Sequence, residues 1–101
     1  MLEQASHAII VLADNDIQKT DFWIHDCSAA TENILIAAHS IGLGAVWLGV
    51  HPSEKLIEDT KNLFEIPKNV TPLSIISLGY PYETKPPREN YNPERIHKNK
   101  W

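Results

Sequence analysis

Apolar and polar positions alternate in blocks along the 101 residues, and each block predicts one element. The β-branched run HAIIVLAD at 7–14 ends in polar turn residues and predicts a buried strand. From 22 to 41 apolar residues recur at helical spacing, and Thr20 or Asp21 can serve as the N-cap of this helix. Its main apolar stripe consists of Ile24, Cys27, Thr31, Ile34, Leu35, Ala38 and Ile41.

The same helix is apolar over much of its remaining surface. Ala29, Ala30, Ile36 and Ala37 lie outside the main stripe. A helix that is apolar nearly all round is buried on several sides, which a chain this short cannot easily provide. We therefore expect this helix to pack against a partner.

The second half of the chain predicts two strands and one helix. AVWLGV at 45–50 is typical of a strand, and an amphipathic helix begins at Pro52 and Ser53 and is ended by Pro67. Residues 73–78 are almost wholly apolar and predict a central strand that is covered on both faces.

Three of the four glycines lie just before or within the 45–50 strand. Gly42 and Gly44 come after a helix and before a strand, whereas phosphate-binding loops run from strand to glycines to helix. These two glycines are expected to close the helix and turn the chain. Gly49 lies inside the strand pattern and marks either a bulge or the close approach of another group to the backbone.

The charge is divided unevenly along the chain. The net charge of −4 argues against a broad nucleic-acid surface. Residues 1–81 carry four basic and ten acidic side chains, whereas 82–101 carry five basic and three acidic. Prolines at 81, 86, 87 and 93 favour an extended path. We therefore expect an α+β core at 1–81 and an extended C-terminal arm at 82–101, whose final Trp101 needs a surface to pack on.

Cellular location and candidate chemistry follow from a few residues. Cys27 is the single cysteine, so an internal disulfide is impossible and a reducing, cytoplasmic location is expected. No apolar run approaches the roughly 20 residues that span a bilayer. Cys27 lies on the apolar stripe, where a thiol is ordinary packing. The five histidines lack metal-ligand spacing, and no catalytic motif is found, so we expect neither a metal site nor a catalytic side chain.

Lys85 and Arg88 flank Pro86 and Pro87 just after the last apolar strand. Two cations on a stiff segment could hold a phosphate, and the alternative is a solvated tail.

Several stretches, taken together, resemble one known family. DCSAATENILIAAHSIGLGAVWLGVHP, PLSIISLGYP, KPPR and the terminal tryptophan are similar to the C-terminal half of the nitroreductase family of FMN-dependent NAD(P)H oxidoreductases. The resemblance runs from about Ala8 to Trp101. It implies an α+β fold, an α/β/α sandwich that is incomplete because the family's N-terminal part is missing. It also implies a homodimer, whose C-terminal tail extends across to the partner.

The resemblance also implies a cofactor site. In the family, the chain around AVWLG passes the isoalloxazine ring of FMN, which falls here on Trp47, Leu48 and Gly49. A basic residue after the last core strand contacts the phosphate, which falls on Arg88, with Lys85 as support. A glycine at 49 would make room for a flat ring beside the backbone. NAD(P)H would then be the electron donor, and a nitroaromatic, quinone or similar small molecule the acceptor.

The sequence departs from the family pattern in two respects. The family's N-terminal arginine-rich segment is absent, and Asn90 stands where many relatives have a second basic residue. The alternative to an enzyme is therefore a truncated, non-catalytic remnant that dimerises or binds a ligand.

Overall fold

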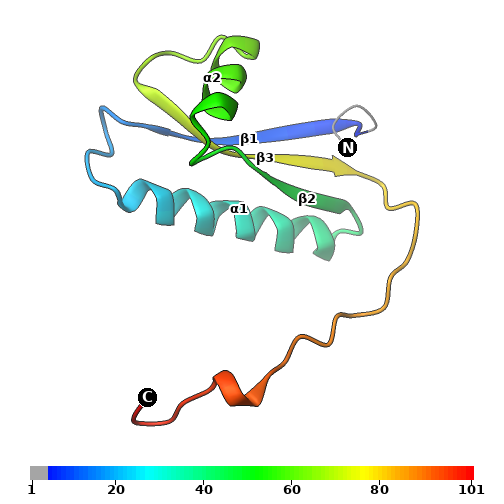
Figure 1. Cartoon of the computed structure of the whole chain (residues 1–101). Helices are drawn as coiled ribbons and strands as arrows, with labels where there is room; N and C mark the ends of the chain where they lie inside the picture. Colours follow the sequence, from blue (N-terminus) through cyan, green and yellow to red (C-terminus); the bar gives the residue numbers. More distant parts are fainter. Residues whose placement is uncertain (1–4) are drawn as a thin grey trace.

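Three antiparallel strands form the frame of the computed structural model, which describes residues 5–101 (Figure 1). The sheet order is β1-β3-β2, with β1 at His7–Asp14, β2 at Gly44–Gly49 and β3 at Val70–Gly79. Both outer strands pair with β3 in antiparallel register. The three predicted strands are confirmed, and the apolar run at 73–78 lies in the middle of the sheet, as its composition indicated.

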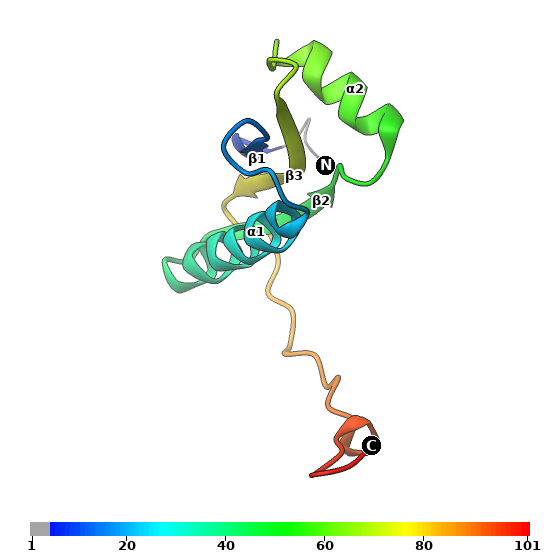
Figure 2. The ribbon, with the colours of Figure 1, turned by 90° about the vertical axis from the view of Figure 1, so that its left-hand side faces the viewer.

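Two helices lie on opposite faces of this sheet. The α-helix α1 (Phe22–Ser40) covers one face, and the shorter α2 (Glu54–Leu63) lies against the other face (Figure 2). The result is a mixed α and β arrangement of helix, sheet and helix. Both predicted helices are confirmed, except for the end of the second one.

The C-terminus of α1 is closed by a Schellman motif. Gly42 adopts a left-handed φ of +84°, as expected for a glycine that follows a helix. Its N–H donates to the carbonyl of His39, and the N–H of Leu43 donates to the carbonyl of Ala38. Ile41, which we predicted on the buried stripe, is 74% exposed, because it is the C-cap and lies beyond the last helical turn.

A buried polar contact joins α1 to β3. The Thr31 hydroxyl donates to the carbonyl of Cys27 at 2.7 Å and lies 2.9 Å from the Ser74 hydroxyl. Because the single proton of Thr31 is already donated, the Ser74 hydroxyl is the donor to Thr31. Both side chains are fully buried, so this pair sets the position of α1 along the central strand.

Helix α2 begins and ends through local hydrogen bonds. The Ser53 side chain is the N-cap and accepts from the N–H of Leu56 at 3.3 Å. The prediction that Pro67 ends the helix is wrong. The chain leaves the helix earlier, because Glu65 adopts a left-handed φ of 52° and the N–H of Ile66 donates to the carbonyl of Lys61.

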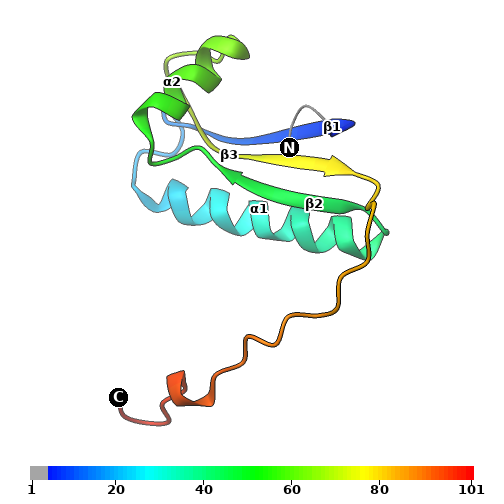
Figure 3. The same ribbon diagram turned by 45° about the vertical axis from the view of Figure 1, so that its right-hand side comes forward.

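The residues that follow β3 lie on the surface. Positions 80–101 are exposed throughout and contain one short 3-10 helix, Pro93–Arg95 (Figures 1 and 3). Figure 3 shows this segment leading away from the sheet and passing below α1. Trp101 is fully exposed, and its ring stacks on that of His97 with 4.5 Å between the ring centroids.

The left-handed backbone at Glu65 generates a stability prediction. Glu65→Gly should raise the free energy of unfolding by about 0.5–1 kcal/mol, since glycine adopts this conformation without the Cβ clash. The matched control is Glu58→Gly, an exposed position in the helical part of α2, which should lose about 1 kcal/mol. Urea unfolding of both variants measures the difference. Equal losses would show that Glu65 is not left-handed.

Candidate functional site

The pairing of β2 with β3 shows on which face of the sheet each of the three predicted ring-contact residues lies. Ser74 of β3 faces α1, so residues at alternate positions of the paired strands share that face. Trp47 pairs with Ile76 and therefore lies on the α1 side. Leu48 pairs with Ile75 and lies on the opposite side. The backbone at the end of β2 is therefore flanked by a large side chain on each face.

Gly49 is the last residue of β2 and leaves open space beside the backbone. It pairs with Ser74, and the register between β2 and β3 is unbroken from Gly44 to Gly49. A bulge therefore does not explain this glycine. A Cβ added at Gly49 would meet no atom within 4 Å. The space where a side chain would stand is free for another group to approach.

The turn after β2 is held firmly to the core. The N–H groups of Val50 and His51 both donate to the carbonyl of Leu73, at 3.0 and 3.1 Å. The His51 ring also meets the Trp23 ring edge-on, with 5.1 Å between centroids. These contacts from β3 and α1 fix the chain immediately after Gly49.

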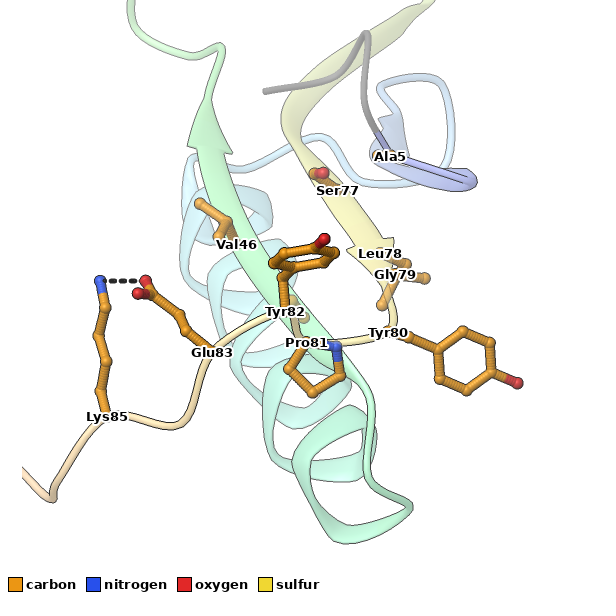
Figure 4. Close-up of a pocket in the computed structure, with 12 residues that line it drawn as sticks. Ala5, Val46, Ser77, Leu78, Gly79, Tyr80, Pro81, Tyr82, Glu83 and Lys85 are labelled. Carbon is orange, nitrogen blue, oxygen red and sulfur yellow. Dashed lines mark ion pairs between the residues drawn. The ribbon is translucent and has the colours of Figure 1, made fainter.

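A pocket of about 460 Å³ lies at the opposite end of β2 (Figure 4). Figure 4 shows Val46 and Ser77 on the sheet face away from α1, with the Tyr82 ring over them. Lys85 also lines this pocket, and its Nζ lies 3.0 Å from a Glu83 carboxylate oxygen in an exposed ion pair. The full lining is Ala5, Gly44, Ala45, Val46, Ser77, Leu78, Gly79, Tyr80, Pro81, Tyr82, Glu83 and Lys85.

The structure does not bring the five predicted residues into one pocket. Lys85 lies with the first half of β2, whereas Trp47, Leu48 and Gly49 belong to its second half and are not part of that lining. Arg88 is exposed and also lies outside it.

Sequence reasoning missed most of the residues that line this pocket, including two tyrosines, and it gave Gly44 the wrong role. Tyr80 and Tyr82 follow the central strand around Pro81, a signal that could have suggested an aromatic rim. Gly44 was expected to turn the chain, but it is the first residue of β2 and lies opposite Gly79. A Cβ there would lie 3.4 Å from the Gly79 carbonyl oxygen, which is ordinary van der Waals contact between two paired strands.

The buried thiol of Cys27 has a packing role rather than a catalytic one. Burial raises the pKa of the Cys27 thiol, and the nearby charge of Asp26 raises it further. A raised pKa keeps the thiol neutral and poorly nucleophilic.

Within residues 5–101, no three histidine, cysteine or carboxylate side chains gather where they could hold a metal ion. In the same part of the chain, neither helix has the length and apolar character needed to cross a membrane.

Comparison with known proteins decides the family. Residues 1–80 match the nitroreductase family. The chain belongs to the nitroreductase family. A relative from Methanothermobacter thermautotrophicus, named "Putative NADH dehydrogenase/NAD(P)H nitroreductase", is 51% identical over 102 residues. The alignment covers all of this chain and 53% of that relative, so this nitroreductase-family chain spans about half the length of a curated relative.

Solved structures share the fold of this nitroreductase-family chain. A structure from Parabacteroides distasonis, described as a "Putative NADH dehydrogenase/NAD(P)H nitroreductase", is 40% identical with a TM-score of 0.92. The match covers 98% of this chain and 58% of that chain. An "FMN-dependent Nitroreductase" from Clostridium difficile is 28% identical with a TM-score of 0.87, over 98% of this chain and 60% of that chain. The mixed α and β fold is therefore that of nitroreductases.

Proposed function

We propose that the chain is part of an FMN-dependent oxidoreductase that passes electrons from NAD(P)H to a nitroaromatic, a quinone or a similar flat acceptor. The observation that carries the proposal is the open space at Gly49, on a strand of a nitroreductase fold. A solved structure with this fold is described as FMN-dependent. The bound flavin would supply the electron transfer, and the protein would supply its position and surroundings.

The end of β2 fits one edge of a flat ring. Gly49 would let the ring approach the backbone, because an added Cβ would meet no atom within 4 Å there. Trp47 and Leu48 provide apolar surface on either side of the strand. The contacts of Val50 and His51 with Leu73 hold this segment in place, so it would need little rearrangement on binding.

We assign the phosphate of FMN to Arg88, with Lys85 in support. Arginine presents a planar fork that can hold a phosphate through two parallel hydrogen bonds. Lys85 is paired with Glu83, whose carboxylate would repel a phosphate and must turn away for Lys85 to contribute. No ion pair of Arg88 is found within the described part of the chain, residues 5–101.

We also propose that the chain works as a homodimer in the cytoplasm. The outer side of α1 is exposed although it carries Ala29, Ala30, Ala37 and the 60% exposed Ile36. Small side chains allow a second helix to approach closely, so this surface suits a second copy. The single, buried cysteine is consistent with a reducing compartment.

Titration of the purified protein with FMN tests the proposal. Binding should shift the flavin absorption band and quench flavin fluorescence, and the complex should oxidise NAD(P)H when an acceptor is present. A folded protein that neither purifies with flavin nor binds added FMN would overturn the proposal and favour a non-catalytic remnant.

Gly49→Val separates a ring-contact role from a purely structural role. The added side chain enters open space and valine favours strands, so the thermal midpoint should stay within a few degrees of the parent. FMN affinity should fall at least about tenfold, because the side chain occupies the ring's place. Ala8→Val, on the exposed part of β1, is the matched control and should bind FMN normally. Unchanged FMN affinity in a folded Gly49→Val variant would remove Gly49 from the site.

Arg88→Ala should weaken FMN binding more than Lys85→Ala does. We expect a loss of about tenfold or more for Arg88→Ala, because charge-assisted bonds to phosphate are the stronger ones. The loss for Lys85→Ala should be smaller, since Lys85 already pairs with Glu83. Titration with riboflavin, which lacks the phosphate, is the control and should not distinguish the variants. Equal FMN affinities for the two variants would contradict the assignment of Arg88.

A further inference from the structure

An exposed ion pair lies beside the first half of β2. The Lys85 Nζ is 3.0 Å from a carboxylate oxygen of Glu83, and both residues line the pocket of about 460 Å³. Figure 4 shows the two side chains meeting at their ends. Among the described residues that line this pocket, these two alone carry a charge. Glu83 therefore decides how much positive charge Lys85 can offer to a ligand.

The backbone around Lys85 is stiff. Only Thr84 separates Lys85 from Glu83, and Pro86 and Pro87 follow directly. The residue before a proline is restricted to extended backbone, and each proline fixes its own φ. Lys85 therefore exchanges one anionic partner for another by rotation of its side chain rather than by movement of the chain.

The ion pair can open without disturbing the fold. The side chains of Lys85 and Glu83 are 76% and 69% exposed. Exposed pairs of this kind add little to stability, because water weakens the attraction and both side chains lose freedom when they meet. An incoming anion can therefore displace Glu83 from Lys85, but it has to compete with that carboxylate.

A phosphate monoester has the charge needed to win this competition. A carboxylate carries one negative charge, whereas a phosphate monoester carries about 1.5 to 2 at pH 7. The Coulomb attraction to an ammonium group grows with the charge of the anion. An anion with a single charge would gain little by replacing Glu83. The ion pair therefore favours a doubly charged ligand over a singly charged one.

We propose that Glu83 lowers the affinity of the site for the flavin phosphate by competing with that phosphate for Lys85. The inference rests on the proposed function, in which Lys85 supports Arg88 at the phosphate. Arg88 forms no ion pair within residues 5–101, so the competition concerns Lys85. Glu83 acts through Lys85 and is a positioning residue, since its own carboxylate would repel the phosphate.

Titration of FMN and of riboflavin into the full chain tests this competition. Glu83→Gln removes the charge and keeps the shape of the side chain, so FMN affinity should rise about threefold to tenfold. Riboflavin, which lacks the phosphate, should bind the variant and the parent equally well. The gain for FMN should largely disappear at about 1 M salt, where charges more than about 3 Å apart are screened.

A double-mutant cycle shows whether Glu83 acts through Lys85. In a Lys85→Ala background, Glu83→Gln should change FMN affinity by less than about twofold, because the unpaired carboxylate is free to turn into water. The matched control is Glu94→Gln, which removes an exposed carboxylate from the 3-10 helix of the same C-terminal arm. It should leave FMN affinity within about twofold of the parent. Circular dichroism shows that each variant is folded, as expected for exposed positions.

Three results would overturn the proposal. The first is an FMN affinity of folded Glu83→Gln that equals that of the parent, or that rises no more than the affinity for riboflavin. The second is an equal gain in the Lys85→Ala background, which would show simple repulsion of the phosphate without competition for Lys85. Both results leave the proposed function standing. The third is a failure of the parent and of every folded variant to bind either flavin, which would overturn the proposed function as well.

Discussion

Burial of the central strand is the constraint on which the rest of the structure depends. Ile76 is fully inaccessible, and Leu73 and Ile75 are nearly so, because β3 has a strand on each side and a helix on each face. The two outer strands touch each other only through β3, and α2 packs on this same strand. Loss of this strand would therefore leave both outer strands unpaired and remove the strand on which α2 packs.

Placement of α1 on this strand depends on chemistry as well as apolar area. The hydrogen bond from Ser74 to Thr31 satisfies the buried Ser74 hydroxyl, which would otherwise lose its hydration without compensation. Only one sliding position of the helix brings the two hydroxyls together. Gly49 of β2 is paired with Ser74. The residue that hydrogen-bonds to α1 therefore also lies beside the candidate contact for the cofactor.

Incomplete burial explains the surfaces that the chain leaves apolar. The hydrophobic core around Ala13, Cys27 and Leu73 is small, and large residues on α2 and on both edge strands remain exposed. The chain aligns with about half the length of a curated relative, and its three strands and two helices leave several large apolar side chains exposed.

The sequence alone determined the elements, because their signals are local. Alternation and helical spacing predicted all three strands and both helices, and helix closure predicted the left-handed Gly42. The same residues carried the resemblance to the nitroreductase family, which the comparison confirmed. The early end of α2 also has a local cause, the left-handed backbone at Glu65. A glutamate does not signal this conformation in the sequence as a glycine does.

Only the tertiary structure decided which of these residues meet. Gly44 lies opposite Gly79 of β3, and Gly49 ends a strand without a bulge and has open space beside it. Both findings depend on the pairing with β3, which lies far along the chain. The same holds for the Thr31 and Ser74 pair, which joins residues 43 positions apart. Sequence patterns report which face of an element is apolar, whereas the register between distant elements is set by packing that no local pattern contains.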